Sequence, residues 1–272
     1  MMAAALRLVV PTLAKAVACL AVVLLLPTSA TANSTLLRVK EAGKVRVCIW
    51  PGYYGISYRH PASGQLQGID IDLSAAFAHD LGVSIAYVDS SFATLIPDVE
   101  QGRCDVAMFA VGILPQRMER LRFTRPYLSS DIYAVTTRSH RSVRTWGDID
   151  QPGVAVGVAA GTFMEPVMAK ALRHATLVSV RAPATREEEL EAGRIDVFMT
   201  DFPYSRRLLD QAAWAKRLAP PSPFHRLPYG YAVKPGDDEW WRAVDAFVGR
   251  IKADGRLAAA AERHGLTAIV EP

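Results

Sequence analysis

Two patterns of apolar residues alternate along the chain after residue 33. Short, mainly apolar runs such as Val45–Trp50 are typical of strands buried inside a sheet. Other segments, such as Ile71–Leu81, carry apolar residues four positions apart, which places them on one face of a helix. Because strands and helices take turns in this way, the pattern predicts an α/β fold with a mainly parallel, doubly wound sheet.

The same alternation begins again in the second half of the chain. Runs at Val154–Val158, Leu177–Val180 and Val197–Thr200 predict three further strands with helices between them. In addition, the heptad Gly102–Met108 is echoed at Gly193–Met199, where five of seven positions match. Each copy follows a predicted helix and leads into a predicted strand. The echo therefore predicts two similar α/β lobes.

The first 32 residues have the composition of an export signal rather than of a folded domain. Two basic residues, Arg7 and Lys15, precede the apolar run Ala16–Leu26, and the segment ends in Ala30-Thr31-Ala32, an A-x-A cleavage pattern. The apolar run is too short for a membrane-spanning helix, although an uncleaved anchor is the alternative. We predict that Met1–Ala32 is a signal peptide cleaved near Ala32, and that the mature chain is periplasmic.

Charge and cysteine content narrow the possible functions. The net charge of +4 is modest and no block of Lys and Arg is present, so no nucleic-acid partner is expected. Without the signal peptide two cysteines remain, Cys48 and Cys104, which are either free or joined by a disulfide in an oxidising compartment. Isolated cysteines and scattered histidines give no metal-ligand spacing, so neither a metal nor another cofactor is expected.

Candidate chemistry is concentrated in the stretch Asp105–Tyr127. It opens with a buried strand, breaks where Gly112 and Pro115 end regular structure, and continues to Arg117. Ligands of open α/β sheets bind at the carboxyl ends of the strands, and a guanidinium there can hold a carboxylate through two parallel hydrogen bonds. Arg117 is therefore a candidate anion site; the alternative is an ordinary surface arginine in a loop.

Taken in order, short motifs along most of the chain resemble the periplasmic solute-binding proteins of ABC transporters, specifically the polar amino-acid family (family 3 extracellular solute-binding proteins). The resemblance implies two α/β lobes joined by two crossover strands, with a small-molecule ligand between them and a transporter permease as partner. No stable membrane insertion is expected after signal cleavage. The matching segments are Gly68–Leu73, Phe92–Pro97, Gly102–Val106, Pro115–Arg117, Phe123–Tyr127, Ala160–Thr162, Gly193–Asp196 with Thr200-Asp201, and Tyr231–Asp237.

The family arrangement also implies domain boundaries. Lobe 1 is expected to take both ends of the mature chain, residues 33–137 and 226–272, and lobe 2 the middle, residues 138–225. The polar stretch Arg138–Arg144 is interpreted as the first crossing between the lobes.

By the same resemblance, a zwitterionic ligand would be held by charges from different lobes. Arg117 is expected to bind an α-carboxylate and Asp201 an α-ammonium, which would close the lobes on the ligand. Thr162, at a predicted helix start, would offer backbone N–H groups to the same carboxylate. Both Thr162 and Asp201 have a simpler alternative role as helix N-caps.

The expected pocket departs from the common family pattern. Residues that are often Ser or Thr are replaced by apolar ones, and the lining is aromatic and poor in acid, which favours a neutral ligand, bulky or apolar, over a basic one. The alternative is that some of these aromatic side chains fill the core. The predicted lining comprises Trp50, Tyr53, Phe92, Phe163, Ala110 and Gly112.

The sequence also resembles, less closely, two classes of protein with other functions. Cyclohexadienyl dehydratases share the fold and use a carboxylic acid in the cleft to act on prephenate or arogenate; here Glu165 is the candidate acid, one residue further from the Gly-Thr pair than in those enzymes. The pairing of Cys48 with Cys104 resembles that in the binding-protein-like accessory components of periplasmic quinoprotein dehydrogenases. Hydrolase and NTPase motifs do not appear.

Overall fold

The computed structural model describes residues 34–272, and the predicted signal peptide Met1–Ala32 lies outside the described residues. Over this described range, no helix combines the length and apolar character needed to cross a bilayer. The same range holds no cluster of three or more His, Cys, Asp or Glu side chains suited to a metal ion.

The chain builds a first sheet in which a late strand lies beside early ones. Strands β4, β1 and β5 are parallel neighbours, and β13, from near the C-terminus, pairs antiparallel with β5, β6 and β7. A separate hairpin pairs β2 with β3. The strands are β1 Lys44–Ile49, β2 Tyr58–Arg59, β3 Leu66–Gln67, β4 Ser84–Asp89, β5 Val106–Gly112, β6 Arg122–Phe123, β7 Leu128–Ser130 and β13 Leu227–Val233.

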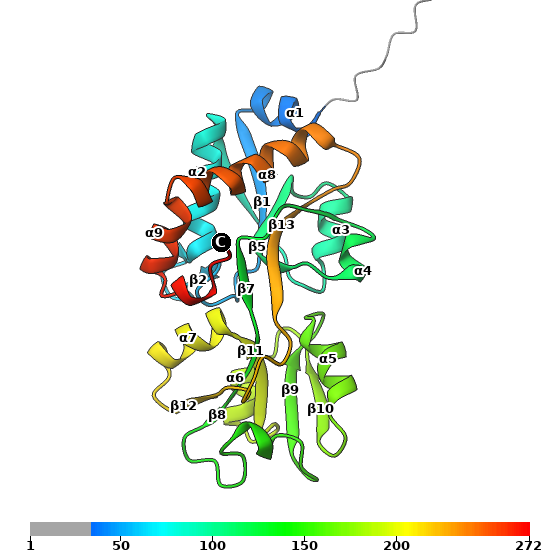
Figure 1. Ribbon diagram of the computed structural model, residues 1–272, viewed down its shortest axis with the longest axis vertical. Coiled ribbons are helices and arrows are strands. Elements are labelled where there is room, and N and C mark those ends of the chain that lie inside the picture. Colours follow the sequence, from blue (N-terminus) through cyan, green and yellow to red (C-terminus); the bar gives the residue numbers. More distant parts are fainter. Residues whose placement is uncertain (1–33) are drawn as a thin grey trace, which may run out of the picture. The chain divides into compact units, whose positions relative to one another are not determined.

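Helices cover this sheet on opposite sides, with α2 and α3 on different faces (Figure 1). Helix α2 buries Leu73 and Phe77, as its spacing predicts, and ends at Gly82 in the left-handed conformation that glycine adopts without cost. The helices of this lobe are α1 Thr35–Glu41, α2 Ile69–Leu81, α3 Leu95–Glu100, α4 Pro115–Met118, α8 Asp238–Ala253 and α9 Arg256–Arg263, with a 3₁₀ turn at Thr267–Ile269.

A second sheet has the order β10-β9-β11-β8-β12 and its own helices. Strands β9, β10 and β11 are parallel, whereas β8 and β12 run antiparallel to their neighbours. The predicted α/β fold with two lobes is confirmed. The elements are β8 Ile132–Thr137, β9 Ala155–Ala159, β10 Thr176–Val180, β11 Val197–Asp201, β12 Ala215–Leu218, α5 Met164–Ala171, α6 Arg186–Glu191 and α7 Phe202–Gln211, with a 3₁₀ turn at Trp146–Asp148.

One expected boundary needs correction. A boundary at residue 137 assigns β8 to the first lobe, but β8 pairs with β11 and β12 in the second sheet. The chain changes sheets at Asp131, between β7 and β8, and returns between Leu218 and Leu227. The polar stretch at residues 138–144 follows β8 as a loop; its polarity reflects exposure to solvent and not a passage between lobes. Below, the second lobe means residues 132–218.

The echoed heptad has the same structural role in both lobes. Asp105 and Asp196 each precede a central strand, and each donates its own N–H to a carbonyl of the neighbouring strand, at Arg46 and Ala155 respectively, over 2.8 Å. Each carboxylate then accepts the N–H of that same neighbouring residue at 2.7 Å. The aspartate thus fixes where one strand enters the sheet beside the next.

A disulfide joins the two cysteines of the described chain. Cys48 lies on β1 and Cys104 precedes β5, with the Cα atoms 5.5 Å apart. Both side chains are buried. Because the bond closes a loop between residues 56 positions apart, it restricts the unfolded chain and is expected to stabilise the fold by roughly 2–4 kcal/mol.

Candidate functional site

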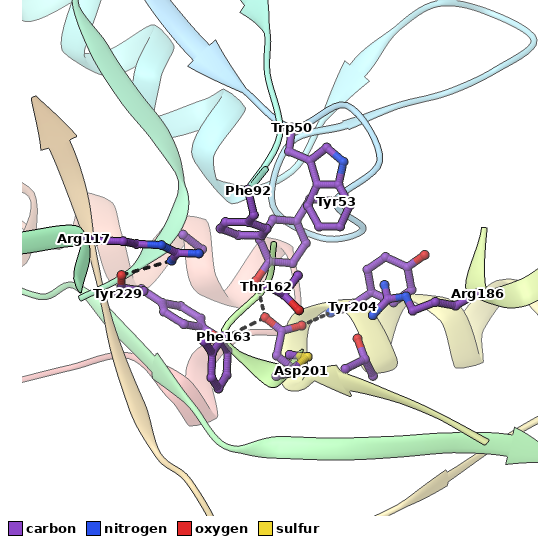
Figure 2. Close-up of a pocket in the computed structure, with 14 residues that line it drawn as sticks. Trp50, Tyr53, Phe92, Arg117, Thr162, Phe163, Arg186, Asp201, Tyr204 and Tyr229 are labelled. Atoms are coloured by element: carbon purple, nitrogen blue, oxygen red, sulfur yellow. Dashed lines mark hydrogen bonds between the residues drawn. The ribbon is translucent and has the colours of Figure 1, made fainter. Parts of the chain in front are cut away.

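A small cavity receives side chains from both lobes, and all nine residues predicted as a ligand site line it (Figure 2). Its volume is about 20 Å³, room for about one water molecule. Five further residues complete the lining. The predicted nine are Trp50, Tyr53, Phe92, Ala110, Gly112, Arg117, Thr162, Phe163 and Asp201, and the additional five are Met164, Arg186, Thr200, Tyr204 and Tyr229.

Arg117 is a buried arginine and not a surface one. It sits in the short helix α4, with 6% of its surface exposed. Its guanidinium donates to the carbonyls of Gly112, at 3.2 Å, and Gly161, at 3.3 Å, and lies 5.0 Å from the centre of the Phe92 ring. A Cβ at Gly112 would overlap the Leu227 side chain but would make only an ordinary contact with this guanidinium. Burial lowers the pKa of Arg117 to about 10.

Gly161 brings the two lobes close together beside Arg117. It has φ +77°, and a Cβ placed there would lie 2.8 Å from the Cα of Ala93 in the first lobe. Its carbonyl accepts the Arg117 bond across the same junction. Only glycine therefore fits this approach without displacing one lobe.

Asp201 has the N-cap role that the sequence offered as the alternative to binding an ammonium group. It is the last residue of β11 and the N-cap of α7, where Oδ1 accepts the Tyr204 N–H at 3.1 Å. Its other oxygen, Oδ2, accepts the hydroxyls of Tyr53, from the first lobe, and of Tyr229, at 2.9 Å. The side chain is buried, which raises its pKa, although these hydrogen bonds oppose the shift.

Thr162 does not stand at the start of a helix as expected. Helix α5 begins at Met164 with Phe163 as its N-cap. The Thr162 hydroxyl donates to the Ala159 carbonyl at 2.7 Å and its N–H points to the same oxygen, so both groups close a turn. Neither its hydroxyl nor its N–H is therefore free to bind an anion in this arrangement.

Aromatic rings form the wall on the first-lobe side. Trp50, Tyr53 and Phe92 contact one another with ring centres 5.2–5.8 Å apart, and Phe92 in turn contacts Phe109 in the core. Such tilted contacts hold each ring in a defined place. In the second lobe, the Phe163 ring stacks on His225. The aromatic side chains thus line the cavity and also extend the core behind it.

Ala110 is held in place by a buried carboxylate. It has φ +49°, uncommon for a residue with a side chain, and its N–H donates to Asp70 at 2.8 Å. Asp70 also accepts the hydroxyls of Tyr127 and Tyr231. Burial raises the Asp70 pKa to about 6, partly offset by these bonds. This network fixes the end of β5 that faces the cavity.

Glu165 does not line the cavity. It accepts the Gly161 N–H at 3.0 Å and the hydroxyl of Ser179, on β10, at 2.7 Å. The Ser179 bond, followed by the Gly161 bond, lowers its pKa. A general acid needs the opposite shift, so this environment does not suit the catalytic role considered for Glu165.

The five additional lining residues were not predicted, because their neighbours in the sequence suggest other roles for them. Arg186 opens the run REEELE, which reads as an exposed helix, yet its side chain is only 5% exposed. Tyr229 lies in an apolar strand where a core role was the natural interpretation, and Tyr204 follows a proline at a helix start. Met164 and Thr200 are next in sequence to the predicted residues Phe163 and Asp201, and nothing else in the sequence indicated that they line the cavity.

Two α/β lobes that present an arginine and an aspartate to one shared cavity define the class of two-lobed solute-binding proteins. The model of the family "Bacterial extracellular solute-binding proteins, family 3" matches residues 45–267, and the chain belongs to this family. The predicted resemblance is confirmed.

Individual relatives include both binding proteins and an enzyme. A cyclohexadienyl dehydratase of Pseudomonas aeruginosa is 30% identical over 90% of this chain and 91% of its own length. The L-cystine-binding protein TcyJ of Escherichia coli K12 is 25% identical over 84% of this chain and 85% of its own. Among solved structures, the ancestral amino acid-binding protein AncCDT-1, a precursor of cyclohexadienyl dehydratase, matches with a TM-score of 0.77 and 27% identity, covering 85% of this chain and 99% of that one. Most of the relatives are named as binding proteins.

Proposed function

We propose that this protein captures a small zwitterionic solute, an amino acid, between its lobes and delivers it to an ABC importer in the periplasm. The observation that carries the proposal is the pair Arg117 and Asp201, which come from different lobes and line one cavity. A free amino acid needs an anion site and a cation site at close quarters, and these two side chains provide them.

The hydrogen bonding of this pair leaves capacity for a ligand. Arg117 has no described carboxylate within 4.0 Å and donates to two backbone carbonyls. A guanidinium has five N–H donors, so some stay available for a carboxylate. Asp201 accepts three hydrogen bonds, and a carboxylate has about four acceptor positions. A zwitterion would supply the missing opposite charges to two buried groups whose charged forms are disfavoured by burial.

The size of the cavity indicates that binding involves lobe movement. About 20 Å³ does not admit an amino acid, so the lobes must separate for entry and close again around the ligand. A ligand that contacts Arg117 in one lobe and Asp201 in the other favours the closed arrangement, because only there does it make both sets of contacts.

Periplasmic location and a permease partner are part of the same proposal. The Cys48–Cys104 disulfide fits an oxidising compartment, and the first residues have the composition of an export signal. The family consists of extracellular binding proteins, and several relatives are named as components of ABC transporters.

Calorimetry and thermal unfolding with a panel of amino acids test this function. A binder of the native state must raise the melting temperature by mass action. Arg117→Lys, which loses the planar fork, and Asp201→Asn are expected to weaken binding at least about 10-fold. Arg120→Lys is the matched control, because Arg120 lies three residues further on and forms an exposed pair with Glu100. If no amino acid stabilises the protein, the proposal is wrong and a surface role as an accessory component gains support.

A dehydratase activity is the second candidate, since a named cyclohexadienyl dehydratase is among the relatives. Glu165 is poorly placed for it, whereas Asp201 is the one carboxylate among the described residues that lines the small cavity, and its pKa is raised. Incubation with prephenate and with arogenate decides the matter: turnover that disappears in Asp201→Asn and persists in Glu165→Gln supports the enzyme. Binding of amino acids without turnover of either compound supports the transport function alone.

A further inference from the structure

Arg186 is a second buried guanidinium at the cavity, and the proposed contacts to a zwitterion do not use it. It is the first residue of α6, where Thr185 and Glu188 form a capping box that fixes the start of the helix. The side chain runs inward and donates to the carbonyl of Met199 at 2.8 Å. With 5% of its surface exposed, it is as buried as Arg117.

Its surroundings hold the guanidinium in place without a direct ion pair. Burial disfavours its charged form, but nearby groups, Glu187 and Asp201 among them, raise the pKa of Arg186 overall. The Arg186 guanidinium carbon lies 4.3 Å from the centre of the Tyr204 ring and 5.1 Å from that of Phe198. Tyr204 is itself fixed by its hydroxyl, which donates to Glu187 at 2.6 Å. Nevertheless, none of the described carboxylates comes within 4.0 Å of Arg186. Figure 2 shows its guanidinium beside the Tyr204 ring, on the second-lobe side of the cavity.

The charges that line the cavity do not balance. Arg117, Arg186 and Asp201 are its charged residues, two cations and one anion, which leave a net charge of +1. Arg186 also lines an adjoining, larger cavity of about 440 Å³, where the added charges of Arg181 and Glu187 cancel. Glu187 and Asp201 offset part of the Arg186 charge from a distance. No described carboxylate lies within 4.0 Å of either guanidinium, so a ligand that supplies one further negative charge in direct contact would be favoured.

We propose that Arg186 binds a second carboxylate, and that the preferred ligand is a small amino acid with an acidic side chain. This inference rests on the proposed function: Arg117 and Asp201 hold the α-carboxylate and α-ammonium, and the side-chain carboxylate reaches Arg186 at the junction with the larger cavity. It replaces the expectation of a neutral ligand, which overlooked this arginine.

The test compares acidic amino acids with their amides, which differ little in size. Calorimetry with L-glutamate and L-glutamine, and with L-aspartate and L-asparagine, is expected to give at least about 10-fold tighter binding of the acid in one of the pairs, because a charge-assisted hydrogen bond replaces a neutral one. Glutarate, which lacks the ammonium group, is expected to bind more weakly than glutamate.

Variants assign the preference to the residue. Arg186→Gln is expected to weaken binding of the acid much more than binding of the amide, which abolishes the preference, and Arg186→Lys to retain part of the preference. Arg181→Gln is the matched control, since Arg181 is exposed and lines only the larger cavity. Should Arg186→Gln fail to fold, the comparison of acid with amide in the unmodified protein together with Arg186→Lys still decides.

The possible failures are distinct. If neutral amino acids bind as tightly as acidic ones and depend on Arg117 and Asp201, the role of Arg186 is refuted and the proposed function stands. If neither acidic nor neutral amino acids bind, the proposed function is refuted together with this inference. If the acid is preferred equally in Arg186→Gln, the preference has another source and the assignment to Arg186 is wrong.

Discussion

The close approach of the lobes at Gly161 offers a test of lobe closure that leaves every charged group intact. In Gly161→Ala the new Cβ would lie 2.8 Å from the Ala93 Cα, 2.9 Å from its nitrogen and 3.1 Å from its Cβ. Carbon atoms in contact prefer about 3.5 Å or more, so the lobes must move apart locally by at least about half an ångström. The bond from Arg117 to the Gly161 carbonyl crosses the same junction and would lengthen with that movement.

A second glycine separates this effect from backbone strain. Gly153 also lies in the second lobe with positive φ, +84°, but a Cβ there meets nothing within 4 Å. Both substitutions to alanine therefore carry the strain of the left-handed conformation, roughly 1 kcal/mol, and only Gly161→Ala adds the clash. Displacement of ligand contacts by a fraction of an ångström to one ångström can cost about 10-fold or more.

The assay is thermal and chemical unfolding of both variants, followed by calorimetry with the amino acid that stabilises the unmodified protein most. Without ligand, Gly161→Ala is expected to lose at least as much stability as Gly153→Ala, because it adds the clash with Ala93 to the same backbone strain. Gly161→Ala alone is expected to bind at least about 10-fold more weakly. Equal affinity of the two variants would refute the argument that the junction at Ala93 must close for binding.

Three further outcomes follow from the buried groups. Burial raises the Asp70 pKa from 3.8 to about 6, so the stability that protonated Asp70 contributes is fully present below about pH 4 and is lost as the pH rises through 6, by about 3 kcal/mol. Urea unfolding at several pH values should show this loss in the unmodified protein and not in Asp70→Asn. The same dependence of the unfolding free energy on pH in both proteins would contradict the prediction. Ligand affinity should fall as the pH is lowered through the raised pKa of Asp201, because an ammonium group needs the ionised carboxylate; calorimetry at several pH values should find no such decline in Asp201→Asn. Reduction of the Cys48–Cys104 bond should lower the free energy of unfolding by roughly 2–4 kcal/mol, whereas the double serine variant should be insensitive to reductant in the same titration.

Patterns repeated along the chain predicted the architecture well, because they report physical requirements of the backbone. The echoed heptad is one example: Asp105 and Asp196 recur because each strand entry needs the same pair of hydrogen bonds. The order of the motifs also predicted that Arg117 and Asp201, which are far apart in sequence, come together, and they do line one cavity. Their binding of a ligand stays a prediction.

What could not be predicted depended on burial and on partners distant in sequence. Arg186 sits in a run of glutamates, and no local pattern distinguishes an arginine that turns inward from one that points to solvent. The tyrosine hydroxyls on Asp201 come from Tyr53 and Tyr229, which are 148 and 28 positions away. In sequence, the polar loop after β8 resembles a passage between lobes, and only the strand pairing shows that the chain changes sheets at Asp131.

The position of β13 has a consequence for the order in which this molecule assembles. That strand lies between β5 and β6 in the middle of the first sheet, yet it comes from residues 227–233. During synthesis or export, the first sheet therefore stays incomplete until β13, near the end of the chain, is available. All five strands of the second sheet lie in the continuous segment 132–218. The second sheet is therefore expected to form before the first one is complete, the reverse of the usual progression from the N-terminus.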